Sequence, residues 1–279
     1  MTEISFFREE IYQPFYWQGG RQAALLVHGF PGTPAEVRPL AEALFAQGWT
    51  VQAPLLPGFG TQIDKLFDQT RENWLTAVSE AHATLRTNHD AVLLVGYSMG
   101  GAIALNVAAQ QPPDRLVLLA PFWRIGTEVH QAIWQGVKRF IPEFQLFKRV
   151  DFTDPRMQKA FSTVFPNIDL EDSEIQTFLQ EMRVPARLVD EVLALGLAAK
   201  EAAGQIHTPT LVIQGSIDQT IPPKATHLLL RELAGQARYV EVATGHALTD
   251  VETAVWPQIK RALLDFAKPL QADTPTWNP

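Results

Sequence analysis

The sequence contains no cysteine among its 279 residues, which excludes disulfides, a thiolate nucleophile and any metal site built on cysteine. It also lacks an apolar run of the roughly 18 residues that a membrane-spanning helix needs, so we expect no stable membrane insertion. Residues 1–17 carry three glutamates and no basic segment followed by an apolar one, unlike a secretory signal peptide. These absences favour a cytoplasmic protein.

Basic residues are too few and too dispersed for a nucleic-acid-binding surface. The chain has 23 Lys and Arg against 30 Asp and Glu, a formal net charge of −7, and no long basic run. Because phosphate contacts require a face of Lys and Arg, we expect no nucleic-acid partner. The composition that is present, 46% hydrophobic and 19% charged, is that of an ordinary globular protein with room for one large domain and an insertion.

Short apolar runs alternate with helical segments along most of the chain. They predict strands at 14–17, 23–27, 49–53, 92–96, 115–120, 210–214 and 239–242. Gly19 and Gly20, between the first two runs, predict a hairpin turn. Because alternating strands and helices are typical of a parallel sheet wrapped by helices, we expect the α/β class.

The alternation stops between residues 122 and 204, where we find no convincing strand. Helical stretches separated by prolines and rich in large apolar residues predict a cap of small packed helices, some of whose side chains face a catalytic mouth. We therefore divide the chain into a first core part at 1–121, a helical cap at 122–204 and a second core part at 205–268. Residues 269–279 contain three prolines and little apolar surface, and are expected to form a flexible tail.

A Gly-x-Ser-x-Gly motif, formed by Gly96, Ser98 and Gly100, separates a predicted buried strand from a predicted helix. So sharp a turn strains the serine backbone, projects its hydroxyl beyond the sheet edge and leaves room only for glycine two positions to either side. The same motif also arises by chance in a plain strand–turn–helix with an idle serine. The strand before it and the helix after it favour Ser98 as a nucleophile.

A nucleophilic serine needs a base, which is normally a histidine that a carboxylate holds in one tautomer. When such a serine lies in a Gly-x-Ser-x-Gly turn between a strand and a helix, the acid and then the histidine come later in the chain, each in a loop after a strand. Asp218 and His246 occupy two such loops, at the carboxyl ends where these sheets place their chemistry. We assign them as acid and base, although Asp218 in a Gly/Ser-rich loop also suits a simple Asx turn.

Six further histidines compete with His246 for the role of base. His28 ends a strand on the correct edge but precedes the serine in the chain, so we expect it to anchor a loop. The others lie in or beside expected helices or at the wrong end of a strand, where a packed or solvated imidazole is expected: His82, His89, His130, His207 and His227.

The loop after the strand at 23–27 is expected to supply an oxyanion donor. Pro31 has no N–H, which leaves the backbone N–H of Phe30. The N–H of Met99, at the positive end of the helix after Ser98, is the natural second donor. The ring of Phe30 is also expected to line the substrate pocket, a role compatible with the first.

The residues after this loop predict the start of a helix. Thr33 has the character of an N-cap, Pro34 suits the first helical position, and Glu36 completes a capping box three residues after Thr33. The helix is expected to end at Gly48, a C-terminal stop signal.

These motifs together resemble the α/β-hydrolase superfamily. The segments that carry the resemblance are His28-Gly29-Phe30-Pro31-Gly32, Gly96-Tyr97-Ser98-Met99-Gly100-Gly101, Gly215-x-x-Asp218-x-x-Ile221-Pro222 and Gly245-His246. Residues 27–60 followed by a modest helical cap look like the group of bacterial carboxylesterases and monoacylglycerol lipases. The resemblance implies an eight-stranded, mostly parallel sheet with the helical cap inserted after the sixth strand.

The resemblance also implies ester hydrolysis without a cofactor or a metal, on small acyl esters or monoacylglycerols. An aromatic-rich cap favours a small apolar ester, with Phe30 and Trp123 as the side chains expected to contact it. The same triad would equally serve C–C bond or amide hydrolysis, or perhydrolysis, because the Ser-Met-Gly-Gly run also resembles cofactor-free perhydrolases. A catalytically dead binding module is a further alternative. Acyl-chain length, movement of the cap and oligomeric state stay open at this point.

Overall fold

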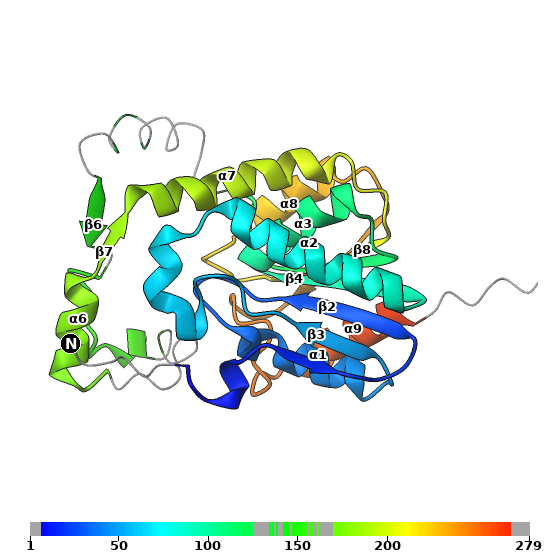
Figure 1. Ribbon diagram of the computed structural model, residues 1–279, viewed down its shortest axis with the longest axis horizontal. Coiled ribbons are helices and arrows are strands. Elements are labelled where there is room, and N and C mark those ends of the chain that lie inside the picture. Colours follow the sequence, from blue (N-terminus) through cyan, green and yellow to red (C-terminus); the bar gives the residue numbers. More distant parts are fainter. Residues whose placement is uncertain are drawn as a thin grey trace, which may run out of the picture.

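A computed structural model describes residues 7–124, 170–268 and, between them, 134, 136, 138, 142–145, 147–155, 157, 158 and 161. Within these residues a mostly parallel sheet of seven strands is covered by helices on both faces (Figure 1). The α/β class predicted from the alternation is therefore confirmed. The expected tail at 269–279 lies outside the described residues.

The strands run side by side in the order β1-β3-β2-β4-β5-β8-β9, and every neighbouring pair is parallel except β1 with β3. Their registers bring the carboxyl ends of the parallel strands to one edge of the sheet. The central strands are buried along almost their whole length, as expected for parallel strands covered on both faces. The bounds are β1 Phe15–Trp17, β2 Gln22–Val27, β3 Thr50–Ala53, β4 Ala91–Tyr97, β5 Arg115–Leu119, β8 Thr210–Gly215 and β9 Ala237–Val242.

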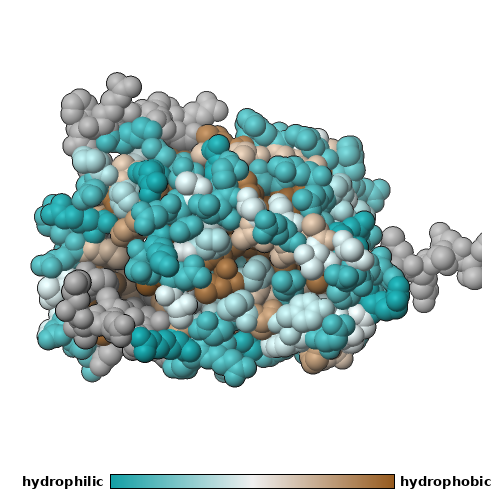
Figure 2. Space-filling view, in the orientation of Figure 1, coloured by the Kyte–Doolittle hydropathy of each residue, from teal (hydrophilic) through white to brown (hydrophobic). Residues whose placement is uncertain are grey.

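Two layers of helices enclose this sheet. Helices α1 and α9 lie against one face, and α2, α3, α7 and α8 lie on the other (Figure 1). Hydrophilic side chains cover most of the face seen in Figure 2, and apolar ones appear in smaller patches between them. The bounds are α1 Arg38–Phe45, α2 Arg71–Asn88, α3 Met99–Gln110, α7 Ala186–Ala203, α8 Pro223–Glu232 and α9 Trp256–Ala267.

Helix α3 forms the centre of the second layer. It is buried from Met99 to Ala108 because it lies between the sheet and its neighbours α2 and α7. Each large apolar side chain buried on it, such as Ile103 or Leu105, contributes about 1.5–3 kcal/mol to folding. The residue that precedes this helix is therefore held by one of the most deeply packed elements of the protein.

Among the described residues the main sheet has seven strands, against the expected eight. The described residues ahead of β1 include the 3-10 turn η1, Glu10–Tyr12, in which Tyr12 N–H donates to Glu9 O at 3.1 Å. The segment expected to be a cap consequently follows β5, the fifth strand in chain order among the described residues, and not a sixth strand.

The hairpin predicted at Gly19 and Gly20 is wrong, because β3 lies between β1 and β2. The two glycines cross the amino-terminal end of β3: Gly20 N–H donates to Gly48 O at 2.6 Å, and Gly19 N–H donates to the Thr50 hydroxyl at 3.0 Å. A Cβ at Gly19 would lie 2.4 Å from Trp49 O, so this crossing requires glycine for its close approach.

The prediction that residues 122–204 lack strands is also wrong. Strands β6, Glu143–Gln145, and β7, Arg183–Pro185, pair antiparallel, and helix α6, Ser173–Glu181, precedes β7. A small apolar cluster holds this region together among the described residues, made of Phe152, Phe161, Leu170 and Leu179. Helix α7 packs along α3, and the cap boundaries at 122 and 204 stay a prediction.

The predicted helix start at Thr33 forms, but without a capping box. Thr33 Oγ1 accepts the Ala35 N–H at 3.4 Å, and the chain makes the 3-10 turn η2, Pro34–Val37, before α1 begins. The Glu36 carboxylate does not return to the N-cap and accepts the N–H of Gly29 instead, at 2.9 Å. After α1, Gly48 adopts φ +84°, in keeping with the predicted stop.

None of the described helices combines the length and the apolar character that crossing a bilayer requires.

Candidate active site

Ser98 lies between the end of β4 and the first residue of α3. Its backbone has φ +53° and ψ −116°, a strained conformation for a residue with a side chain. The turn is tight enough to need both flanking glycines, since a Cβ at Gly96 would lie 2.4 Å from Gly100 O and a Cβ at Gly100 would lie 2.2 Å from Val27 O. The predicted strand–turn–helix geometry around the serine is thus present.

The structure brings His246 and Asp218 to this serine. His246 lies in the loop after β9, and its Nε2 is 3.0 Å from Ser98 Oγ. Asp218 lies in the loop after β8, and its Oδ2 is 2.7 Å from His246 Nδ1. Because an ionised carboxylate only accepts, Nδ1 carries the imidazole proton and Nε2 has its lone pair toward the serine hydroxyl. This tautomer is the one that a general base requires.

The Asp218 carboxylate is fully buried and its oxygens accept four hydrogen bonds. Oδ1 accepts the backbone N–H groups of Thr220 at 2.8 Å and Ile221 at 2.9 Å. Oδ2 accepts the Nε2 of Gln214 at 3.2 Å in addition to the imidazole N–H. These donors hold the carboxylate in one orientation, with Oδ2 turned toward His246.

Gln214 is itself locked by its surroundings. Its Oε1 accepts the hydroxyl of Thr226 at 2.6 Å, and its Nε2 also donates to Ile221 O at 2.9 Å. All of these groups are buried, so an exchange of the amide oxygen and nitrogen would set the Gln214 oxygen against two other acceptors, Asp218 Oδ2 and Ile221 O. Gln214 was not predicted from the sequence, because its place at the end of a buried strand gives no signal of this role.

The expected oxyanion donors flank the serine. Met99 is the first residue of α3, where a helix leaves its N–H without an intrahelical partner. The loop that carries Phe30 lies against the nucleophile, because a Cβ at Gly29 would lie 3.1 Å from Ser98 Cβ. Phe30 is 38% exposed, and its ring contacts Phe59 edge to face.

His28 anchors the same loop through hydrogen bonds of its imidazole ring. It is fully buried, its Nδ1 donates to Gly29 O at 2.9 Å, and its Nε2 accepts the N–H of Leu56 at 3.1 Å. Burial lowers the pKa of His28 to about 4, so the ring is neutral. The histidine therefore ties the loop after β2 to the loop after β3, as the loop-anchoring prediction requires.

Tyr97 also contacts His246, an interaction that was not predicted from the sequence. Its hydroxyl donates to His246 O at 2.9 Å, and its ring stacks on the imidazole with centroids 5.4 Å apart. Burial raises the pKa of Tyr97 well above its ordinary value, so the hydroxyl keeps its proton and stays a donor. The motif position between Gly96 and Ser98 tolerates many residue types, so its sequence carried no hint of this contact.

Trp123 lies at the start of the segment expected to be the cap. Its indole is buried, and Nε1 donates to Ala225 O on α8 at 3.0 Å. A Cβ at Gly196 on α7 would lie 2.7 Å from Trp123 O, so α7 packs closely on its backbone. These contacts fix Trp123 between two helices, and its role in substrate binding stays a prediction.

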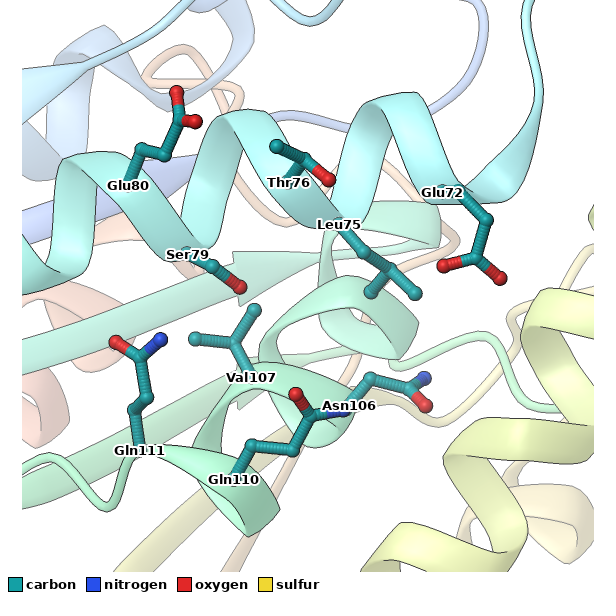
Figure 3. Close-up of a pocket in the computed structure, with 9 residues that line it drawn as sticks. All are labelled: Glu72, Leu75, Thr76, Ser79, Glu80, Asn106, Val107, Gln110 and Gln111. Atoms are coloured by element: carbon teal, nitrogen blue, oxygen red, sulfur yellow. The ribbon is translucent and has the colours of Figure 1, made fainter.

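A polar pocket of about 310 Å³ lies between α2 and α3, away from the triad (Figure 3). Figure 3 shows side chains from both helices turned toward the space between them. Its lining residues are Glu72, Leu75, Thr76, Ser79, Glu80, Asn106, Val107, Gln110 and Gln111. Within the described part of the chain, no group of three metal-ligating side chains is arranged to hold an ion.

Comparison with known proteins gives a consistent result. The family described as serine aminopeptidase, S33, matches residues 19–265. A thermostable monoacylglycerol lipase from Bacillus sp. (strain H-257) is 40% identical over 100 residues, 36% of this chain and 40% of that protein, so the chain aligns with less than half of that relative. A carboxylesterase from Bacillus subtilis (strain 168) is 25% identical over 242 residues, 85% of this chain and 89% of that protein.

The fold also has a close counterpart among solved structures. A metagenome-derived lipolytic enzyme matches with a TM-score of 0.72 and 21% identity, over 92% of this chain and 97% of that one. At this level of identity the likeness concerns the arrangement of strands and helices.

Proposed function

The chain belongs to the serine aminopeptidase S33 family of α/β-hydrolases, and we propose that it hydrolyses carboxylic esters through an acyl-enzyme on Ser98. Its likeness to proteins named monoacylglycerol lipase and carboxylesterase supports the ester class. The observation that carries the proposal is the line of three side chains, with Ser98 Oγ 3.0 Å from His246 Nε2 and His246 Nδ1 2.7 Å from Asp218 Oδ2.

Acylation begins when Ser98 Oγ attacks the ester carbonyl carbon and passes its proton to His246 Nε2. A positioned general base of this kind contributes about 10²–10⁴ in rate. Asp218 stays ionised and stabilises the imidazolium that forms. The carbonyl oxygen becomes an oxyanion, which the backbone N–H groups of Phe30 and Met99 receive.

The oxyanion donors are the largest electrostatic contribution in this scheme. Each is worth about 2.7–4 kcal/mol of transition-state stabilisation when it is aimed at the developing charge. The amino-terminal end of α3 adds its helix dipole at the same point. Collapse of the tetrahedral intermediate breaks the bond to the alcohol oxygen, which leaves with the proton from His246.

Deacylation repeats the route with water. His246 Nε2 removes a proton from water, the hydroxide attacks the acyl carbon, and the second tetrahedral intermediate occupies the same donors. The bond between the acyl carbon and Ser98 Oγ then breaks, and the serine recovers its proton from the imidazolium. The carboxylic acid is released and the free enzyme is restored.

The substrate is proposed to be a small apolar ester, such as a short acyl ester or a monoacylglycerol. The half-exposed ring of Phe30 offers apolar surface beside the nucleophile. Amide or C–C bond hydrolysis and perhydrolysis use the same first attack, so a panel of esters, amides and vinylogous diketones with one acyl group separates these chemistries. We expect esters to be cleaved at least tenfold faster than the matching amides.

The replacement Ser98→Ala tests the assignment directly. With a chromogenic butyrate ester, we expect hydrolysis to fall by more than about a thousandfold, because the acyl-enzyme cannot form. Ser79→Ala, on α2, is the matched control and should keep wild-type activity. A fluorophosphonate should label the wild-type protein at residue 98 alone. Activity of Ser98→Ala within tenfold of wild type, or no labelling at Ser98, would eliminate the proposal.

A further inference from the structure

Glu36 lies beside the nucleophile although the mechanism above does not use it. Its Oε2 accepts the N–H of Gly29 at 2.9 Å, inside the short turn that Gly32 N–H closes on Gly29 O at 3.2 Å. A Cβ at Gly32 would lie 2.1 Å from the Glu36 carboxylate, and a Cβ at Gly29 would lie 3.1 Å from Ser98 Cβ. The carboxylate thus fills the inside of the loop that faces the serine.

Helix capping does not account for this placement. Thr33 supplies the side-chain cap of η2, and Glu36 turns away from it toward Gly29. An anionic group here also opposes the oxyanion that the site must stabilise, and burial raises the pKa of Glu36 to about 7. The ionisable groups that bear on it are His246, after β9, and Tyr97, at the end of β4.

Glu36 restrains the backbone conformation at Gly29. A peptide unit is planar, so the Phe30 N–H shares one rigid plane with Gly29 C=O, and the Gly29 N–H shares the preceding plane with His28 C=O. The two planes meet at the Gly29 Cα, where glycine allows wide rotation. Donation from His28 Nδ1 to Gly29 O at 2.9 Å fixes the plane that contains the Phe30 N–H. The hydrogen bond from Gly29 N–H to Glu36 fixes the plane that contains the Gly29 N–H.

We propose that Glu36 is a positioning residue of the reaction, which holds Gly29 so that the Phe30 N–H points at the oxyanion. This inference rests on the proposed function, since it takes Phe30 as an oxyanion donor. Glu36 acts through the backbone of Gly29 and does not touch the substrate. Its acceptor oxygen, and not its charge, is the required feature, because a neutral carbonyl oxygen also accepts an N–H.

Two variants whose side chains have nearly the same length as glutamate separate the role of the acceptor oxygen from that of the negative charge. Glu36→Gln keeps an acceptor oxygen within reach of Gly29 N–H, whereas Glu36→Met keeps the bulk and removes the acceptor. We expect Glu36→Met to lower kcat for a butyrate ester at least tenfold with KM changed less than threefold, and Glu36→Gln to keep kcat within threefold of wild type. Glu42→Gln, an exposed glutamate of α1, is the control and should leave both constants unchanged.

A transition-state analogue gives the second readout. A trifluoromethyl ketone forms a hemiketal oxyanion on the serine, so its inhibition constant should rise in Glu36→Met by the same factor by which kcat/KM falls. Thermal unfolding checks that the variant is folded. If Glu36→Met does not fold, Glu36→Ser, which is too short to reach Gly29, replaces it in the same comparison.

Equal kcat values in Glu36→Met and Glu36→Gln would overturn the inference, as would an effect confined to KM. Ser98→Ala measured alongside keeps the two proposals distinct. Hydrolysis by Ser98→Ala would reject the acyl-enzyme. If Ser98→Ala is inactive but Glu36→Met keeps the wild-type kcat, only the role of Glu36 is rejected.

Discussion

The replacement Asp218→Asn tests the triad by exchanging a single carboxylate oxygen for an amide NH₂ group. In the wild type, Oδ1 accepts two backbone N–H groups, from Thr220 and Ile221, and Oδ2 accepts His246 Nδ1 and Gln214 Nε2. The asparagine oxygen must take the Oδ1 place, because an NH₂ group there would oppose two fixed donors. The new NH₂ then faces His246 and turns Nδ1 from donor into acceptor.

The consequence is the wrong imidazole tautomer. With Nδ1 accepting, the ring proton moves to Nε2, which is 3.0 Å from Ser98 Oγ in the wild type and would no longer accept the serine proton. A tautomer error of this kind lowers kcat by about 10⁴, or about 5.4 kcal/mol of barrier. Gln214 cannot rescue it by turning over, since its Nε2 also donates to Ile221 O and its Oε1 accepts from Thr226.

The assay is steady-state hydrolysis of a chromogenic butyrate ester at pH 7, with burst amplitude measured by rapid mixing. We expect kcat to fall by about four decades with KM little changed. Asp90→Asn, at an exposed position before β4, is the control and should behave as wild type. A kcat for Asp218→Asn within tenfold of wild type would refute both the tautomer argument and the place of Asp218 in the mechanism.

Three further predictions concern support of the site. Tyr97→Phe keeps the ring but removes the hydrogen bond to His246 O, so we expect a loss of about 1–3 kcal/mol of unfolding free energy in urea and a severalfold lower kcat; an unchanged urea midpoint would contradict this. Gly100→Ala places a Cβ 2.2 Å from a backbone oxygen and should destabilise the fold by about 3 kcal/mol or abolish soluble expression. Burial lowers the pKa of His28 from 6.5 to about 4 and raises that of Glu36 from 4.5 to about 7. Between pH 4.5 and 6.5, His28 is protonated in the unfolded chain and neutral in the folded protein, so its contribution to stability rises with pH. Over the same range, Glu36 is ionised in the unfolded chain and protonated in the folded protein, so its contribution to stability falls with pH. The stability of Glu36→Gln should rise by about 2 kcal/mol relative to wild type across this window, as measured by urea unfolding at several pH values.

The sequence predicted the parts of the fold that follow from local patterns. Apolar runs such as that of β4 and β8 are typical of buried parallel strands, and the glycines around Ser98 are required by the sharp turn alone. The place of β3 between β1 and β2 was not predictable, because Gly19 and Gly20 fit a hairpin equally well. Pairing across the sheet, which is decided by distant segments, selected the other topology.

The short strands β6 and β7 show the same limit. Each has three residues, too few for a period of two to stand out from the helical segments around them. Their pairing stabilises them only after the chain between them has folded back, so neither strand is visible in its own sequence. Glu36 is a second case, since the spacing from Thr33 predicted a capping box, and a loop seven residues earlier supplied a competing donor.

The sequence alone determined which residue types were available for the chemistry, and it placed Ser98, Asp218 and His246 each in a loop after a strand. Strand ends and tight turns are local features, so their signals survive in a linear chain. Only the tertiary structure decided how these loops are supported: Tyr97 meets His246 across 149 positions of the chain, and Glu36 reaches the loop beside the nucleophile. The physical reason is that a buried polar group takes whichever partner the packing brings near, and packing is set by the whole chain.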